Sequence, residues 1–122
     1  MAAPNLVNVT SILGKTIGAA LGTSVTTDIL TCASDKVLKI NSIIVANVDG
    51  TNSANLTVSF YDATDTTRYR LARTVTVPGK STLVVLGKDS PIYLEEGDRI
   101  SGGASNASRL EIIISYEELD DA

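Results

Sequence analysis

The stretch that decides the fold is IIVANVDGTNSANLTVSFYD, residues 43–62. An apolar run enters the turn Asp-Gly-Thr-Asn at residues 49–52, and a second run leaves it with polar and apolar residues in alternation. Alternation with a period of two is typical of a strand that buries one face. We expect three side chains of the second run to point into the core: Leu56, Val58 and Phe60. The turn predicts a hairpin corner between the two strands.

The strand that precedes the turn, residues 37–49, is apolar on both faces. Strict alternation places Ile40, Ile44, Ala46 and Val48 on one face, which we expect to be the core face. It places Ile43 and Val45 on the other face. A strand of this kind is either central in a two-layer structure or covered by a second subunit. Ile43 and Val45 are therefore candidate partner-interface residues.

Strand patterns recur along the chain about every ten residues, separated by polar turns and without a convincing helix. They fall at residues 15–23 (a Gly-punctuated edge strand), 24–32, 69–77, 81–87, 90–94 and 109–119. The last strand should bury Leu110, Ile112, Ile114 and Tyr116. This spacing predicts an all-β fold, an antiparallel β-sandwich of jelly-roll type with about eight strands. Residues 1–12 have weak periodicity and are interpreted as an extended N-terminal arm, and residues 13–122 as one domain.

Composition excludes several chemistries. The chain has no His and one Cys, so Cys-His, Ser-His-Asp and His-ligated metal sites are ruled out. We expect no enzymatic activity and no cofactor, and interpret Cys32 as a small buried residue on a strand. The net charge of −4 argues against general binding of nucleic acid. No apolar run reaches roughly 18 residues, so no membrane span is expected.

Charged residues cluster at turns and on one strand. Asp62 and Asp65 are a weak match to a Ca²⁺ loop, and solvated turn residues are the alternative. The segment EEGD at 95–98 predicts a hairpin corner, with positive φ at Gly97 and backbone hydrogen bonds to Asp98. Three arginines, Arg68, Arg70 and Arg73, follow one strand. They could pair with the domain's own carboxylates or meet an acidic partner, and Arg73 on an otherwise apolar face suggests a bulge or a paired arginine.

The order of these segments resembles a family of small virion structural proteins of tailed bacteriophages. The likeness covers residues 24–119. It rests on NVDGT at 47–51, Val-Pro at 77–78, PIYLEEGD at 91–98 and SYEE at 115–118. The resemblance implies a β-sandwich component of the phage particle without a catalytic motif. It implies synthesis in the host cytoplasm and a final location in the virion, with the capsid surface favoured.

The function that the resemblance and the composition favour is that of a capsid decoration or cement protein. Such a protein binds the major capsid protein or other virion proteins and stabilises the shell. We expect a homo-oligomer, with a trimer favoured from capsid symmetry. The candidate contact residues are Asn5, Leu6 and Val7 of the arm, together with Ile43, Val45, Arg68 and Arg70. A neck, tail or fibre-associated protein is the first alternative. A carbohydrate-binding module is a more remote one, and it would need exposed tyrosines.

Overall fold

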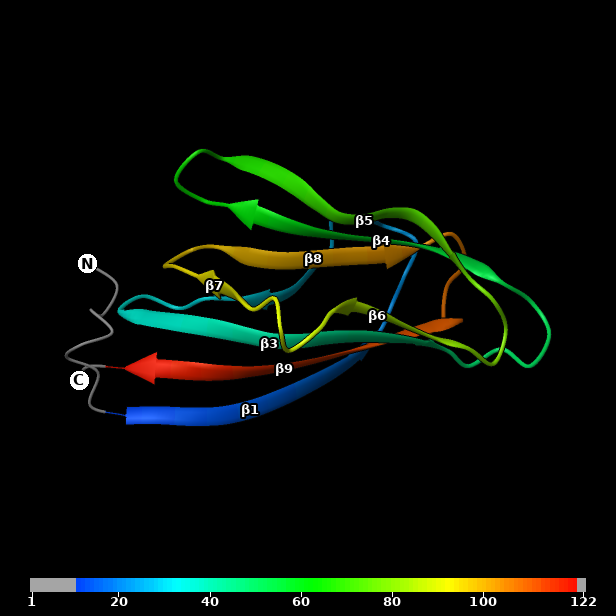
Figure 1. Ribbon diagram of the computed structural model, residues 1–122. Coiled ribbons are helices and arrows are strands. Elements are labelled where there is room, and N and C mark those ends of the chain that lie inside the picture. Colours follow the sequence, from blue (N-terminus) through cyan, green and yellow to red (C-terminus); the bar gives the residue numbers. More distant parts are fainter. Residues whose placement is uncertain (1–10, 121–122) are drawn as a thin grey trace.

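The computed structural model describes residues 11–120, which form two antiparallel sheets packed face to face (Figure 1). The strands are β1 (Ser11–Ala20), β2 (Asp28–Thr31), β3 (Lys36–Asn47), β4 (Ala54–Asp62), β5 (Thr67–Val77), β6 (Thr82–Leu86), β7 (Ile92–Leu94), β8 (Arg99–Ala104) and β9 (Leu110–Asp120). The fold of this part of the chain is all-β, and no helix in it is long and apolar enough to cross a membrane.

The strand order is that of a jelly roll. The first sheet, called sheet A here, has the order β1-β9-β3-β6, with β7 also paired to β3, and sheet B has the order β2-β8-β4-β5. The pairs β1–β9, β2–β8, β3–β6 and β4–β5 are nested in the sequence. A single long hairpin folded over on itself gives this arrangement, in which two Greek keys close into a double sheet. The sandwich expected from the sequence is confirmed.

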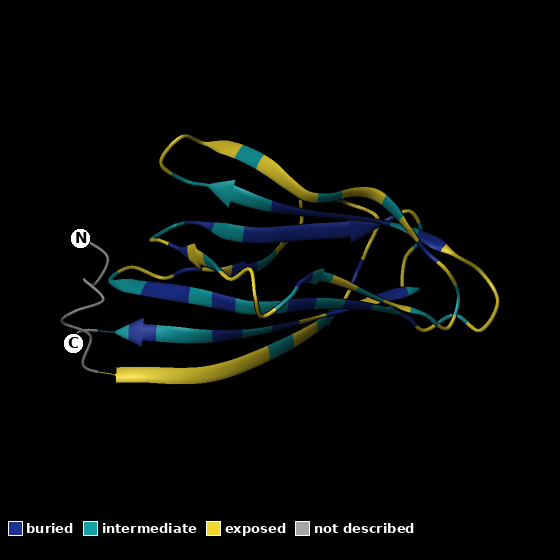
Figure 2. Cartoon of the chain, viewed as in Figure 1, coloured by how far each residue is buried: buried dark blue, intermediate teal, exposed yellow. Residues whose placement is uncertain are grey.

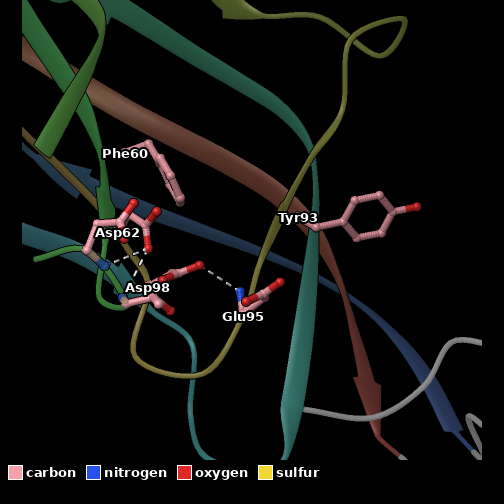
Figure 3. Close-up of a pocket in the computed structure, with 7 residues that line it drawn as sticks. Phe60, Asp62, Tyr93, Glu95 and Asp98 are labelled. Carbon is pink, nitrogen blue, oxygen red and sulfur yellow. Dashed lines mark hydrogen bonds between the residues drawn. The ribbon is translucent and has the colours of Figure 1, made fainter. Parts of the chain in front are cut away.

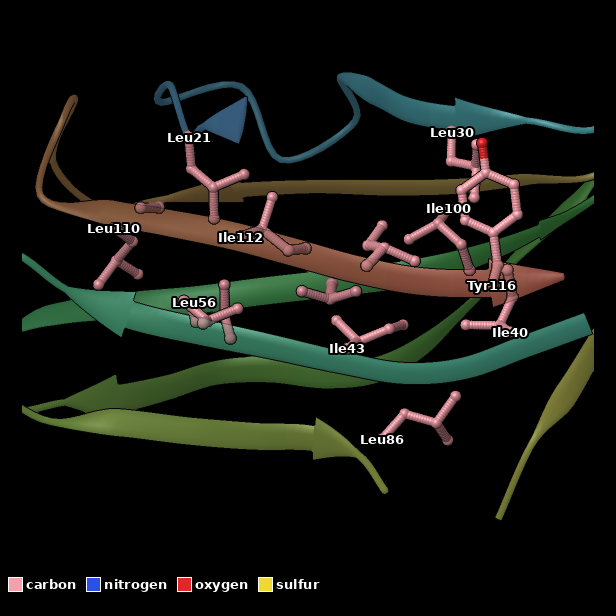
Figure 4. Close-up of a cluster of buried hydrophobic side chains, with 14 of the residues drawn as sticks. Leu21, Leu30, Ile40, Ile43, Leu56, Leu86, Ile100, Leu110, Ile112 and Tyr116 are labelled. Carbon is pink, nitrogen blue, oxygen red and sulfur yellow. The ribbon is translucent and has the colours of Figure 1, made fainter. Parts of the chain in front are cut away.

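The core lies between the two sheets and is almost entirely aliphatic (Figure 4). Ile40, Ile43 and Ile112 from sheet A and Leu56 and Ile100 from sheet B are completely buried. The alternation in β9 is confirmed, because Leu110, Ile112, Ile114 and Tyr116 all point into this core. Removing this much branched apolar surface from water is the main stabilising contribution in a chain that has no Trp and one Phe.

The expected faces of β3 are wrong beyond Asn41. Ile40 pairs with Tyr116 and Ser42 pairs with Ser115, so Asn41 is an extra residue, a β-bulge. The bulge reverses the alternation, and Ile43 and Val45 become fully buried core residues. Their predicted outward position, and with it a direct contact to a partner, is excluded. Ile44 instead lies on the outer face of sheet A and is half-buried.

The turn at residues 49–52 does not close a hairpin, because β3 belongs to sheet A and β4 to sheet B. It is a corner between the sheets. Asp49 Oδ1 accepts hydrogen bonds from the backbone N–H groups of Thr51 (2.8 Å) and Asn52 (2.9 Å). These bonds stabilise the charged carboxylate and lower the pKa of Asp49. Beyond the corner, Leu56 and Val58 are buried as predicted, and Phe60 is half-buried.

The second strand and the eighth differ from the prediction. Only Asp28–Thr31 of the expected strand 24–32 is extended in a ladder, and β8, whose sequence RISGGA carries two glycines, was not expected. The structure gives the reason for one of them. A Cβ on Gly103 would lie 2.5 Å from the carbonyl oxygen of Ser24, because the segment before β2 crosses directly over β8.

β1 confirms the expected edge strand for residues 15–20 and extends it toward the N-terminus, whereas residues 21–23 lie outside the strand. Ser11 and Ile12, which were expected in the arm, pair with Asp120 and Leu119 in the β1–β9 ladder. Residues 1–10, with the candidate contacts Asn5, Leu6 and Val7, and residues 121–122 lie outside the described part.

Candidate partner-binding surface

The outer face of sheet A carries a transverse apolar row. Gly18 of β1 pairs with Ile113 of β9, Ile113 pairs with Ile44 of β3, and Ile44 pairs with Val84 of β6. Because directly opposed residues point to the same side of a sheet, these four positions form one line across it. We call this line the apolar row. Two of its members are open to solvent: Ile113 is 44% exposed and Val84 is 60% exposed.

The apolar row is bordered by a hollow on one side and by polar residues on the other. The hollow, of about 370 Å³, lies beside β1 and is lined by Gly18, Ala20 and Ile113 among others. On the opposite side Thr16 and Ser115 share a hydrogen bond of 3.3 Å between their hydroxyl groups. An apolar strip with polar borders is typical of a surface that binds another molecule. Ile44 was expected on the core face, because the bulge at Asn41 has no sequence signature. Val84 was not among the predicted contact residues.

β5 forms one edge of sheet B and carries the three arginines. Two register shifts interrupt its pairing with β4, and Thr74 has a positive φ of 54°. The bulge expected near Arg73 is therefore confirmed. We call Arg68, Arg70 and Arg73 the arginine edge.

The arginine edge forms no ion pair with any carboxylate of residues 11–120, in contrast to Arg99, which pairs with Asp28 at 3.1 Å. The expected pairing with the domain's own carboxylates is thus wrong for the described residues. Arg68 instead stacks on Tyr61, with its guanidinium 5.1 Å from the ring centre. Unpaired guanidinium groups remain available to an acidic partner.

The structure does not bring the predicted contact residues together. Arg68 and Arg70 lie at the edge of sheet B, Ile43 and Val45 lie in the core, and the arm residues are outside the described part. Two separate surfaces, the apolar row and the arginine edge, replace the single predicted interface.

The open side of the sandwich exposes aromatic rings. Tyr69 is 52% exposed and stacks against Phe60 with ring centres 6.5 Å apart. These rings line a shallow hollow of about 180 Å³ with Leu71 and Ile92. The short strands β6 and β7 leave this part of β5 uncovered, so its inward face meets solvent (Figure 2).

An acidic hollow of about 290 Å³ adjoins this region, with Asp62, Asp65, Glu95 and Asp98 in its lining (Figure 3). Asp98 is buried and accepts hydrogen bonds from the backbone N–H groups of Ala63 (3.0 Å) and Glu95 (2.9 Å). Asp62 accepts one from the N–H of Thr64 at 3.0 Å.

Both carboxylates thus close turns. The positive φ predicted at Gly97 is confirmed at 83°, but the turn at 95–98 joins β7 of sheet A to β8 of sheet B, so the predicted hairpin corner is wrong. Within residues 11–120, no group of three or more acidic or Cys side chains could hold a metal ion.

Cys32 is buried, as expected, although it lies just beyond β2. Its Sγ donates to the carbonyl oxygen of Lys36 at 3.2 Å. Burial raises the pKa of this thiol to about 11. The thiol is therefore protonated at neutral pH and lacks the thiolate that nucleophilic chemistry requires.

The chain matches no protein-family model and no curated protein. The surfaces described above and the sequence resemblance are therefore the basis for a function.

Proposed function

We propose that this chain is a non-enzymatic structural protein of a tailed-phage virion, which decorates or cements the capsid by binding the major capsid protein. The observation that carries the proposal is the apolar row, an exposed strip on the outer face of sheet A that has no cover within residues 11–120. Its site of action is the outer surface of the particle.

The fold and the resemblance support the proposal from two sides. Jelly rolls recur in viral capsid proteins, although lectins and cupins use the same architecture, so the fold alone does not decide. The segments at 47–51, 77–78, 91–98 and 115–118 resemble small phage structural proteins and favour the virion among these options.

The proposed mechanism is binding alone. The apolar row loses its contact with water against a capsid subunit, and fully burying a Val or Ile side chain contributes about 1.5–3 kcal/mol. The arginine edge meets acidic groups of a neighbouring subunit and sets orientation more than affinity. The proposal includes self-association. The trimer expected from capsid symmetry has no contact within residues 11–120 that argues for it.

The test is binding of the purified protein to capsid shells assembled without it. We expect saturable binding and a higher melting temperature of the shell. Val84→Asp in the apolar row should weaken binding at least about tenfold, since it puts a charge into the buried contact. Val48→Asp is the matched control, because Val48 is 54% exposed and lies just before the corner at 49–52, outside the row. Equal binding by both variants would contradict the role of the row, and binding only at one vertex would favour the neck or tail alternative.

One observation favours a second candidate, carbohydrate binding at the open side of the sandwich. Tyr69 and Phe60 line the shallow hollow, and exposed aromatic rings are the platforms on which sugars stack. Titration calorimetry with host surface glycans would test it. Binding that is lost in Tyr69→Ala would support this candidate, and no heat of binding would remove it.

A further inference from the structure

β1 is an edge strand whose second side pairs with no strand of the described chain. All ten of its residues pair with β9 without a register shift. Most of the strand is exposed (Figure 2), including Ile12 at 61% and Leu13 at 49%. It therefore presents a long, regular row of backbone groups to solvent.

The other sheet edges of residues 11–120 are protected. β2 has four residues and a register shift, and β5 has two register shifts and the arginine edge. β6 and β7 have only five and three residues. Short length, bulges and charge are the devices by which proteins prevent edge-to-edge pairing. β1, in contrast, has ten residues, no register shift and no Pro, and Lys15 is its single charged residue.

The free backbone groups of β1 can be assigned. The N–H of Leu21 donates to Leu110 of β9 at 2.9 Å. Because N–H groups alternate in direction along a strand, the odd-numbered residues of β1 face β9. The even-numbered residues then direct their N–H and C=O groups to the free edge: Ile12, Gly14, Thr16, Gly18 and Ala20.

We propose that this edge pairs with β1 of a second copy of the chain, antiparallel and about a two-fold axis, to give one sheet continuous through both subunits. The charge distribution along the edge favours a second copy of the chain as the partner. The chain carries a net charge of −4, but the single charge of β1, Lys15, is already paired with Glu118 at 3.1 Å. The edge itself is thus close to neutral, and two copies can approach without like-charge repulsion along it.

The faces of the sheet select the register. Outward residues of one copy must stand beside outward residues of the other, so each pair joins two even or two odd residue numbers. A pair centred on Lys15 would place two ammonium groups opposite each other. A pair centred on Thr16 avoids this contact and places Ile12 opposite Ala20 and Leu13 opposite Ala19. This register also covers Ile12 and Leu13, the two most exposed large side chains of the strand. A pair centred farther along β1 would leave both of them exposed.

The first test is the molar mass in solution, measured by light scattering over a dilution series. We expect twice the 12.8 kDa of the chain, with dissociation on dilution. Thr16→Pro removes an edge-facing N–H in both copies and should raise the dimer dissociation constant at least about tenfold. Thr16→Val keeps the N–H and should remain dimeric. If Thr16→Pro fails to fold, Thr16→Lys replaces it, since it places two ammonium groups opposite each other. A monomer or trimer of the unaltered chain, or equal masses of the variants, would overturn the proposal.

Cross-linking tests the register separately. Cys32 is buried and does not compete for oxidation, so a single introduced cysteine reports on its own position. Thr16→Cys should form a disulfide-linked dimer faster than Lys15→Cys. Faster linkage of Lys15→Cys would overturn the Thr16 centre. The pairing does not depend on the proposed function, because it is measured on the purified protein without capsid shells.

Discussion

At the scale of single residues, close backbone approach decides which side chains are allowed. Gly103 is the clearest case, because the carbonyl of Ser24 occupies the place that a side chain would need. The sequence shows a Gly-Gly pair at 102–103 and offers no sign of which segment crosses it. No strand was predicted at this glycine pair, and yet β8 lies inside sheet B, between β2 and β4.

Gly103→Ala should lower the free energy of unfolding by about 1–3 kcal/mol, because the added methyl group overpacks the crossing. Urea denaturation followed by circular dichroism measures the change. Gly87→Ala is the control, since no atom lies within 4 Å of the Cβ position there. Equal stability of the two variants would mean that the segment before β2 does not lie on β8.

The raised pKa of Cys32 predicts that stability depends on pH. Its pKa in the folded state, about 11, lies above the ordinary value of 9.0, so the folded protein holds the thiol proton more tightly. The stabilisation is complete below about pH 9 and is lost as the pH rises toward 11. Denaturation at pH 8, 9.5 and 11 should show that the free energy of unfolding declines as the pH rises. The decline should be smaller in Cys32→Ala, because only the other titrating groups contribute to it there. The same decline in both proteins would contradict the assignment to Cys32.

At the scale of elements, the bulge in β3 decides which side of the strand is core. The pattern of residues 37–49 predicted a strand apolar on both faces, and this is confirmed. Strict alternation then assigned the two faces the wrong way round beyond Asn41, because one inserted residue reverses every later side chain. β9 contains no such insertion, and its inward residues were predicted without error.

The two faces of β3 can be compared with one substitution type. Ile43→Asp should lower the free energy of unfolding by more than about 4 kcal/mol, because it buries an unpaired charge. Ile44→Asp should cost about 1–2 kcal/mol through lost β-propensity and half-buried surface. Thermal denaturation separates the two. A larger loss of stability for Ile44→Asp would mean that Ile44, and not Ile43, faces the core.

For the arginine edge we predict an effect of substitution on binding and not on stability. Arg70 is exposed and lies outside every ion pair of residues 11–120, so Arg70→Glu should change stability by no more than about 0.5 kcal/mol. It should weaken binding to capsid shells, and more strongly at low salt. Lys88→Glu, an equal charge change in the turn after β6, is the control. Equal effects of the two variants on binding would assign the change to net charge and not to the arginine edge.

At the scale of the whole molecule, the sequence predicted the architecture better than the surfaces. Regular alternation and regular turn spacing are local properties, and together they indicated a jelly-roll sandwich. Which edge is free and which face is uncovered depends on pairing between distant segments, such as Ser11 with Asp120. The contact residues predicted from local patterns were therefore dispersed by the fold, while the apolar row emerged only from three adjacent ladders.

The measurement that tests the central claim most directly is quantitative mass spectrometry of purified phage particles, with the copy number of this chain compared with that of the major capsid protein. A decoration or cement protein should be present at a ratio near one to one, or one to a small integer. A few copies per particle would move the chain to the neck, tail or fibres, and its absence from particles would contradict a structural role in the virion.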